Sequence, residues 1–231
     1  MKRSLLFLVI STFSFFCLFA QQPNIREIEQ QTEAGNATMK YQLAQGYFMG
    51  CGIPHDTNKG MKWLRKAAEQ GLPAAQRDLG NAYATGKFLS KNETEAVKWL
   101  RKAAEGNNID AQNTLANCYT DGQLGFSKDP VEAFKWYEKA ANLGDHHSAY
   151  YTACRYENGI GVTQDYVEAY KWFIISCRDD LRGYFDGKDS DKWIQEEESL
   201  KQKMTIKQIN EGQKLANDWI NNFKRDDRNL D

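Results

Sequence analysis

Length, composition and charge limit the classes of protein to which this chain can belong. The chain has 231 residues, of which 41% are hydrophobic and 13% aromatic, which suits one or two ordinary globular domains. The 30 basic residues stand against 31 acidic residues, so the formal net charge is −1. A chain with this near-neutral charge does not show the excess of basic residues that is typical of proteins that bind nucleic acids or anionic membranes. We therefore expect neither as a partner.

The first 20 residues predict a secretory signal peptide. Lys2 and Arg3 supply a positive start, and an uncharged, largely apolar run extends to Ala20, after which cleavage is expected. One alternative is a lipoprotein signal at Cys17, which the bulky Phe16 disfavours. The other is an uncleaved membrane anchor, since the run approaches the ~20 residues that cross a bilayer. We expect cleavage and a secreted or periplasmic chain with no segment inserted in a membrane.

Tryptophans recur along the chain at a nearly constant spacing. Four of them are separated by 36, 37 and 36 residues: Trp63, Trp99, Trp136 and Trp172. A tyrosine precedes each by 16 or 17 residues, at Tyr47, Tyr83, Tyr119 and Tyr156. A fixed period in this range predicts stacked supersecondary units, each of which buries its apolar face against its neighbours. We therefore expect the four tryptophans in the core rather than in a ligand-binding aromatic ladder.

Each unit is predicted to contain two helices. The first helix carries small residues where a partner helix can approach closely, at Ala44, Gly80, Ala116 and Ala153. The second helix begins at a residue that favours the N-cap position, at Asp56, Asn92, Asp129 and Asp165. In three units a glutamate follows three residues later, at Glu95, Glu132 and Glu168. This spacing predicts a capping box, in which the glutamate side chain accepts from the backbone N–H of the cap residue.

The sequence outside the repeats is expected to cover their ends. Residues 24–34 predict a half-helix, and after Cys177 the period stops. A polar stretch then leads to a helix over residues 192–203. Thr205 with Gln208 predicts a capping box for a last amphipathic helix, and the charged residues 224–231 are expected to be disordered.

The repeated motif resembles the Sel-one-like repeat (SLR), a relative of the tetratricopeptide repeat. The residues that carry the resemblance are Ala75-x-x-x-Leu79-Gly80-x-x-Tyr83-x-x-Gly86 followed by Ala96-x-x-Trp99-x-x-Lys102-Ala103-Ala104. The resemblance implies an all-α, right-handed α-solenoid that acts as a scaffold or adaptor, and exported bacterial members of the family often have envelope, stress or host-interaction roles. Fold alone does not fix function.

The resemblance also divides the chain. We expect a signal peptide over 1–20, an N-terminal cap over 21–34, four repeats, and C-terminal capping helices with a tail over 179–231. The four repeats are predicted over residues 35–70, 71–106, 107–143 and 144–178.

Two positions depart from the repeat pattern in ways that affect packing. Phe88 replaces a loop glycine, and Gly60 stands where the other repeats have Ala96, Ala133 and Ala169. Glycine in a helix interior is less stable than alanine by ~0.5–1 kcal/mol. Replacing Gly60 by alanine is therefore expected to stabilise the fold, provided that the added methyl group fits.

The residue types that carry chemistry do not form a recognisable site. The four cysteines of the mature chain, Cys51, Cys118, Cys154 and Cys177, lack the eight-residue spacing of the cysteine-rich SLR proteins. Four free thiols are favoured, and a Cys118–Cys154 disulfide is the alternative. The three histidines, His55, His146 and His147, are expected in solvated loops, because no ligand stands at metal-binding spacing beside them. We expect no metal and no cofactor.

Two functions from different classes are therefore compared. The favoured one is a monomeric, non-enzymatic scaffold that binds a protein or peptide. The alternative is an envelope enzyme acting on peptidoglycan or β-lactams, an activity that the resemblance brings from some cysteine-rich relatives. Neither the cysteine spacing nor a nucleophile–base pair supports the enzyme.

The candidate binding residues come from the first helices, which line the concave groove in tetratricopeptide-like stacks. Gln45, Asn81 and Asn117 stand at one register of three successive repeats, and their amides suit the backbone of an extended peptide because each offers a donor and an acceptor. The remaining candidates are Tyr41, Phe48, Arg77, Asn113, Tyr150 and Glu157. The alternative is that these are solvated polar residues, which are common on surfaces.

The signal peptide gives the first testable prediction. Mass analysis of the exported protein should find an N-terminus at Gln21, in its open or cyclised form, because the apolar run ends at Ala20. Recovery of intact Met1 in the membrane fraction would instead support the uncleaved anchor.

Overall fold

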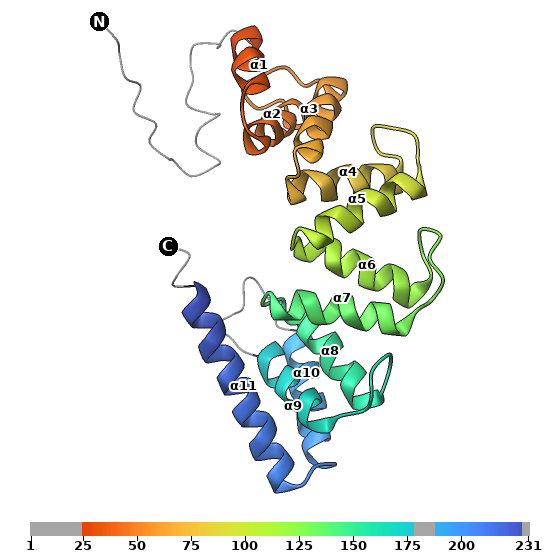
Figure 1. The fold of residues 1–231 in the computed structure, drawn as a ribbon, viewed down its shortest axis with the longest axis vertical. Coiled ribbons are helices and arrows are strands. Elements are labelled where there is room, and N and C mark those ends of the chain that lie inside the picture. The colour runs from red at the N-terminus through yellow and green to blue at the C-terminus, as the bar shows by residue number, and fades with distance from the viewer. Residues whose placement is uncertain (1–24, 178–187, 228–231) are drawn as a thin grey trace, which may run out of the picture. The chain divides into compact units, whose positions relative to one another are not determined.

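The computed structural model describes residues 25–177 and 188–227, and every regular element in these two ranges is an α-helix (Figure 1). The predicted all-α class is confirmed. The chain divides inside α5 into two compact units, unit 1 (residues 1–99) and unit 2 (residues 100–231). The helices are α1 (Ile25–Glu33), α2 (Ala37–Met49), α3 (Thr57–Glu69), α4 (Pro73–Thr85), α5 (Glu93–Glu105), α6 (Ile109–Asp121), α7 (Pro130–Asn142), α8 (His146–Asn158), α9 (Tyr166–Ser176), α10 (Lys188–Lys201) and α11 (Ile206–Asp227).

Unit 1 is built from helix pairs that share one core. α2 packs against α3, α3 packs against α4, and α1 lies on α2. Leu43, Leu64 and Leu79 are at most 2% exposed and lie in one cluster with Trp63 and Trp99. Burying a side chain of this size contributes ~1.5–3 kcal/mol. α1 matches the half-helix that the sequence predicts over residues 24–34.

Unit 2 continues the helix pairs and adds two helices that lie outside the repeat period. α6 packs against α7, α7 against α8, and α8 against α9. Both α10 and α11 pack against α9, and Figure 1 shows α11 running alongside it. Trp193 and Leu200 of α10 and Ile220 of α11 are buried in the same cluster as Trp172 and Phe173 of α9. The last two helices therefore extend the core beyond the fourth repeat.

The second helix of each repeat begins at the predicted cap residue. The side chain of Asp56 accepts from the N–H of Lys59 at 3.0 Å, and that of Asn92 accepts from the N–H of Glu95 at 3.1 Å. Asp129 and Asp165 cap α7 and α9 in the same way. These bonds satisfy donors that the first turn of a helix leaves without a partner.

The other half of the predicted capping box is wrong for Glu132 and Glu168. The carboxylates of Glu95, Glu132 and Glu168 accept from a lysine three residues further along the helix. The backbone N–H of each cap residue donates instead to the carbonyl oxygen of the repeat tyrosine, at 2.9–3.1 Å. Because that N–H is already bonded, the glutamate has no cap donor to bind. A complete capping box is found at α11, where Thr205 N–H donates to Gln208 Oε1 and Gln208 N–H to Thr205 Oγ1.

The hydroxyl of each repeat tyrosine reaches the residue 18 positions earlier in the chain. Tyr83 Oη accepts from Arg65 at 3.3 Å, and Tyr119 Oη accepts from Arg101 at 3.2 Å. Tyr47 donates to Glu29, and Tyr156 donates to Glu138. Burial and the Glu29 carboxylate together raise the pKa of Tyr47 to about 12. Each tyrosine thus links its own helix to the preceding one of the stack.

The four repeat tryptophans are buried as predicted. They are between 1% and 8% exposed. The Nε1–H of Trp99 donates to Glu95 Oε2 at 3.1 Å, so the indole nitrogen keeps a polar partner inside the core. The aromatic-ladder alternative is therefore wrong for these residues.

Two further expectations need correction. His146 and His147 lie in the first turn of α8 rather than in a loop. His146 is 6% exposed, with Nδ1 3.3 Å from the carbonyl oxygen of Ile175, and the ring of His147 meets Trp193 edge-on. The expected disorder over 224–231 is wrong as far as Asp227, because α11 continues to that residue.

Other expectations lie outside the described residues. These are the signal peptide, the last four residues, and residues 178–187 of the polar stretch that the sequence predicts over 178–191. Residues 188–191 of that stretch instead begin α10. Within the described ranges no disulfide joins Cys51, Cys118, Cys154 and Cys177, which agrees with the favoured alternative.

Replacing Trp99 by alanine tests the core. Because Trp99 is 7% exposed within the cluster of unit 1, the change should lower the free energy of unfolding by about 3–5 kcal/mol. Chemical denaturation measures it. Val131→Ala, at a side chain 47% exposed, is the control and should stay within about 0.5 kcal/mol. Equal effects for the two variants would contradict the core assignment.

Candidate functional site

Two cavities lie beside the first helices of the repeats, one in each unit. The cavity in unit 1, here called the 1–2 groove, has a volume of about 400 Å³, and the one in unit 2, the 3–4 groove, about 410 Å³. Residues lining the 1–2 groove include Gln45, Phe48, Met61, Asp78, Asn81 and Phe88. Residues lining the 3–4 groove include Thr120, Lys128, Pro130, Tyr151, Cys154, Arg155 and Ile160.

The two grooves occupy the same place in the repeat pattern. Phe48 and Thr120 each follow the repeat tyrosine of the first of the two repeats. Asp78 and Tyr151 each stand five residues before the tyrosine of the second. The groove is therefore a product of the repeat geometry, although the two copies are not lined from all the same positions: Met61 of α3 lines the 1–2 groove, whereas Lys128 and Pro130 line the 3–4 groove.

An aromatic pair forms part of the 1–2 groove. The rings of Phe48 in α2 and Phe88 in the loop after α4 are stacked, with centroids 5.3 Å apart and planes 9° from parallel. The amine of Lys87 lies 4.9 Å from the centre of the Phe88 ring. Phe88 remains 47% exposed. The groove thus presents a flat aromatic surface to solvent.

The backbone of Phe88 is strained. Its φ of 70° lies in the left-handed region, where a bulky non-glycine residue is a genuine outlier. Gly52 and Gly161 stand at the same loop position of repeats 1 and 4, with φ of 73° and 78°. The strain costs ~1–3 kcal/mol, and such residues are concentrated at functional sites.

Gly60 gives room to the other ring of the pair. A Cβ placed on Gly60 would lie 2.5 Å from Cε1 and 2.7 Å from Cδ1 of Phe48. The expectation that Gly60→Ala stabilises the fold is therefore corrected, because the added methyl group collides with Phe48. In repeats 2 and 3 the residue after the tyrosine is the smaller Ala84 or Thr120, which leaves the alanine of the second helix compatible.

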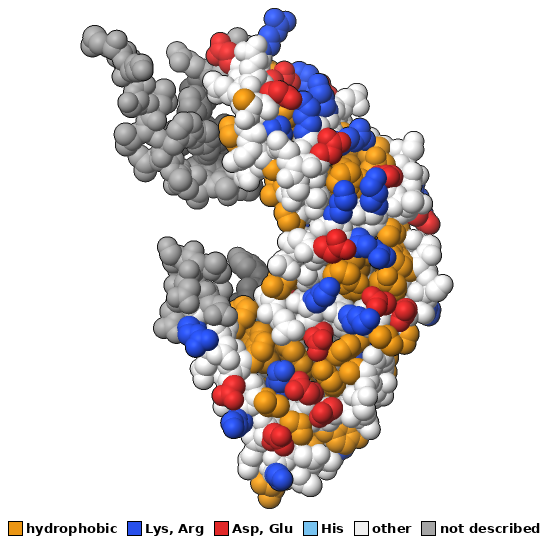
Figure 2. Space-filling model, viewed as in Figure 1, with side chains coloured by type: hydrophobic (Ala, Val, Ile, Leu, Met, Phe, Trp, Pro, Cys, Tyr) orange, Lys and Arg blue, Asp and Glu red, His pale blue; other side chains and the backbone are white. Residues whose placement is uncertain are grey.

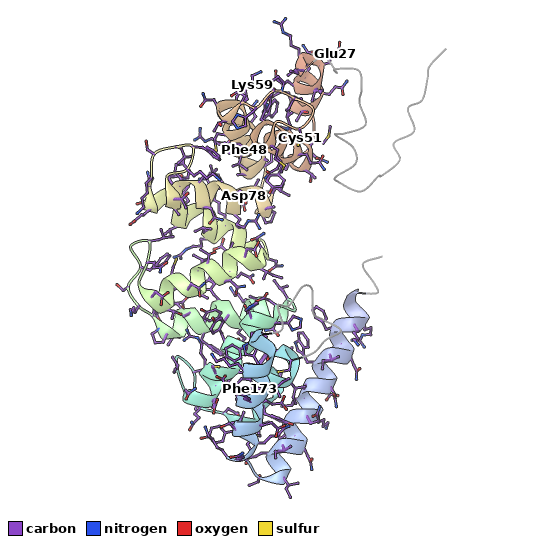
Figure 3. The ribbon with its side chains drawn as sticks, turned by 180° about the vertical axis from the view of Figure 1, so that it is seen from behind. Glu27, Phe48, Cys51, Lys59, Asp78 and Phe173 are labelled. Carbon is purple, nitrogen blue, oxygen red and sulfur yellow. The ribbon has the colours of Figure 1, made fainter. Side chains whose placement is uncertain are left out.

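Asp78 organises the polar side of the 1–2 groove. Its Oδ2 accepts from the hydroxyl of Tyr41 at 2.7 Å and from Nε2 of Gln45 at 3.2 Å. Its Oδ1 accepts from Nε and Nη2 of Arg77 at 3.0 and 2.8 Å. Figure 3 labels Phe48 on α2 and Asp78 on α4, the two helices that contribute these side chains. Burial, with Asp78 as the second cause, raises the pKa of Tyr41.

All five predicted binding residues of unit 1 are therefore found at this groove. Gln45, Phe48 and Asn81 line it, while Tyr41 and Arg77 bind Asp78, which also lines it. Asp78 was not among the predicted binding residues, and no functional role was predicted for Phe88. The departure of Phe88 from the loop glycine was visible, but its contact with Phe48 was not.

The predicted residues of unit 2 are not brought together. Asn113 of α6 is a structural residue that binds the start of α8: its Nδ2 donates to Asp145 Oδ2 at 3.1 Å, and its Oδ1 accepts from the hydroxyl of Ser148. Asn117 is exposed and accepts from the hydroxyl of Tyr137 at 2.6 Å.

Tyr150 and Glu157 need correction as open binding residues. Tyr150 is 7% exposed because Trp193 of α10 stacks on it, with ring centroids 4.8 Å apart. The carboxylate of Glu157 is paired with Lys203 at 2.8 Å, and its side chain is 14% exposed. Both residues are covered by the chain that follows the repeats, which the repeat pattern does not describe.

No candidate metal centre is found among the described residues. In residues 25–177 and 188–227, no group of three or more His, Cys, Asp or Glu side chains is placed to hold a metal ion. Burial and the nearby carboxylate of Glu196 raise the pKa of the Cys154 thiol to about 12, so this cysteine lacks the thiolate character of a nucleophile.

Comparison with known protein families decides the family. The model of the Sel1 repeat matches residues 38–72, 73–108, 109–145 and 146–181. The chain belongs to the Sel1 repeat family. This confirms the resemblance to the Sel-one-like repeat, and its four repeats account for α2 to α9.

Solved structures support the same all-α solenoid class. A Sel1 repeat protein from Oxalobacter formigenes is 28% identical with a TM-score of 0.59, over 74% of this chain and 78% of that one. The protein c5321, a protective antigen of uropathogenic Escherichia coli with an SLR fold, is 24% identical with a TM-score of 0.61. That match covers 87% of this chain and 49% of the antigen, and it indicates the fold alone. Among curated proteins, no match was found.

A double-mutant cycle tests the packing of the aromatic pair. Gly60→Ala should lower the melting temperature in the wild-type background, because its Cβ meets the Phe48 ring at 2.5 Å. In a Phe48→Ala background the same change should raise stability by ~0.5–1 kcal/mol, the usual advantage of alanine in a helix. The two values come from thermal and chemical denaturation, and the same sign in both backgrounds would refute the contact.

Proposed function

We propose that this chain is a scaffold that binds a peptide or protein partner on the first helices of its repeats. Sel1 repeats generally mediate protein–protein interaction, and the chain belongs to that family. The observation that carries the proposal is the exposed aromatic pair of Phe48 and Phe88, maintained in the 1–2 groove by a strained backbone.

The aromatic pair has the properties of a binding anchor. Aromatic side chains are enriched in the buried centres of protein interfaces, and a few such residues dominate the binding energy. Phe88 is 47% exposed in a loop position where glycine removes the strain. Leu124, five residues after Tyr119, also has a left-handed backbone, with φ of 51°, but it packs against the core of unit 2. The more exposed ring of Phe88 can instead contact an apolar group of a partner.

The polar side of the groove suits the backbone of an extended segment. The amide of Asn81 is exposed, and it offers one donor group and one acceptor group. Gln45 is oriented by its bond to Asp78, which also fixes Tyr41 and Arg77. Side chains that are already ordered lose less entropy when a partner binds. Asn117 is the matching amide of unit 2, and it is also exposed.

We propose a secreted or periplasmic location for this activity. It is supported by the sequence of residues 1–20, which lies outside the described residues. None of the helices in the described ranges is long and apolar enough to cross a membrane. Figure 2 shows basic and acidic side chains interspersed on the face in view, which fits a protein partner better than a nucleic acid. No observation favours the alternative of an envelope enzyme.

Site-specific photo-crosslinking tests the groove directly. Mature protein with a photoreactive phenylalanine analogue in place of Phe88 should crosslink a discrete partner in the native envelope or secretome. The same analogue at Ile194 is the control, because that side chain is 45% exposed, against 47% for Phe88, and lines neither groove. The same products from both positions would show that the groove has no special affinity.

A second variant separates binding from folding. Phe88→Gly removes the left-handed strain, worth ~1–3 kcal/mol, and loses a ring stacking worth ~0.5–1.5 kcal/mol. Its melting temperature should therefore not fall, while affinity for the crosslinked partner falls at least tenfold. Asn107→Gly, at an exposed residue with φ of 62°, repeats the backbone change without an aromatic ring and should bind as the wild type does. Wild-type affinity in Phe88→Gly would place the interface elsewhere.

A further inference from the structure

Arg155 is a buried cation that pairs with no carboxylate in the part of the chain that the structure describes. The residue is 8% exposed. Its Nη2 donates to Thr120 Oγ1 at 2.8 Å, and its guanidinium lies 5.0 Å from the centre of the Tyr137 ring. Neither partner is an anion, and guanidinium has five N–H donors. A buried charge without a counter-ion is costly, so this side chain retains capacity to bind an anion.

The repeat does not require an arginine at this position. The residue just before the repeat tyrosine is Gly46, Ala82 and Cys118 in the first three repeats. Ala82 and Cys118 are 8% and 2% exposed, so the position is a buried site for a small side chain. Repeat 4 has Arg155, a long cationic side chain, at that site. The other repeats pack with a small residue there, so packing does not require an arginine.

Arg155 lines the 3–4 groove, which has a distinct distribution of charge. Lys128 lines the same groove, and none of its lining residues is acidic. The carboxylates near Cys154 have lysine partners, Glu157 with Lys203 at 2.8 Å and Glu196 with Lys192 at 3.9 Å. The groove is therefore complementary to one negative charge.

The remaining walls of the 3–4 groove are largely apolar. Pro130, Tyr151 and Ile160 contribute them, and Tyr151 and Ile160 are 44% and 47% exposed. A ligand that fills this groove needs an apolar group close to its negative charge.

We propose that the 3–4 groove binds the C-terminal carboxylate of a peptide whose last residue is apolar. An α-carboxylate and its side chain share one Cα, so the charge reaches Arg155 while the side chain contacts Tyr151 and Ile160. Arginine binds a carboxylate through two parallel N–H···O bonds, which adds geometric selectivity. A glutamate or aspartate within a peptide carries its charge on the side chain and leaves the apolar walls unfilled.

This inference rests on the proposed function only in taking the ligand to be a peptide. The 1–2 groove and the 3–4 groove share no residue. Loss of partner binding in Phe88→Gly and loss of carboxylate binding in an Arg155 variant are separate results, so either proposal can fail alone.

Titration of the full mature chain with three short peptides tests the inference. The probes are acetyl-Ala-Ala-Leu with a free carboxylate, the same peptide as its C-terminal amide, and acetyl-Ala-Glu-Leu amide. The side-chain N–H resonances of arginine report binding at Arg155, and calorimetry gives the affinity. The free acid should bind at least tenfold more tightly than either amide, because hydrogen bonds to charged groups are the strong ones. Equal binding of acid and amide, stronger binding of the internal glutamate, or no binding of the free acid would each overturn the proposal.

Substitutions of arginine test whether Arg155 is the residue that binds the carboxylate. Arg155→Gln should abolish the preference for the free acid over the amide, whereas Arg65→Gln should retain it. Arg65 is a suitable control because it also donates to a hydroxyl, that of Tyr83 at 3.3 Å, and lines neither groove. The preference for the acid is measured on the wild-type chain, so the test stands even where Arg155→Gln folds poorly. A preference that survives in folded Arg155→Gln would contradict the assignment.

Discussion

The repeat tyrosine is the residue on which the rest of the structure depends, because it fixes three helices at once. Its carbonyl oxygen accepts the N–H of the next cap residue, as Tyr83 does from Asn92 at 2.9 Å, and so sets where the second helix begins. Its hydroxyl reaches the preceding helix, as Tyr83 does at Arg65. The end of the first helix is thereby held on both sides. The side chains next to the tyrosine, such as Phe48 after Tyr47, then take fixed positions at a groove, whatever their chemistry.

The residues that build the fold, such as the repeat tyrosines, are therefore different from those that give a groove its specificity. In the 1–2 groove, Phe48, Gly60 and Phe88 depart from the repeat pattern together, and the structure shows why: Gly60 makes room for Phe48, and Phe48 stacks on Phe88. In the 3–4 groove the departure is Arg155, at a position that is otherwise small. Changes that are individually unfavourable but contact one another are better explained by a shared role than by independent drift.

Local rules made the fold predictable, and contacts between distant elements account for the errors. The period of Trp99 and the cap at Asn92 are short-range signals, and both predictions hold. The capping box failed because a tyrosine carbonyl competes for the cap N–H. Tyr150 was misplaced because α10 lies outside the period and covers it. Asp78 and Arg155 were not predicted because the candidates were taken only from repeat positions expected to face the groove. Aligning the four repeats at the position just before the tyrosine shows Arg155 where the others have Gly46, Ala82 and Cys118.

The energetics explain how a small repeat protein can retain such departures. A left-handed Phe88 costs ~1–3 kcal/mol, and Gly60 in a helix interior a further ~0.5–1 kcal/mol. Both are large against a domain stability of ~5–15 kcal/mol. A partner that binds only the folded chain stabilises it by ~2.7 kcal/mol when its concentration is 100 times the Kd. An occupied 1–2 groove therefore offsets much of the strain, whereas an empty one leaves the full cost in place. Phe88 and Gly60 therefore lower the stability of the free chain, and binding of a partner in the 1–2 groove compensates for that loss.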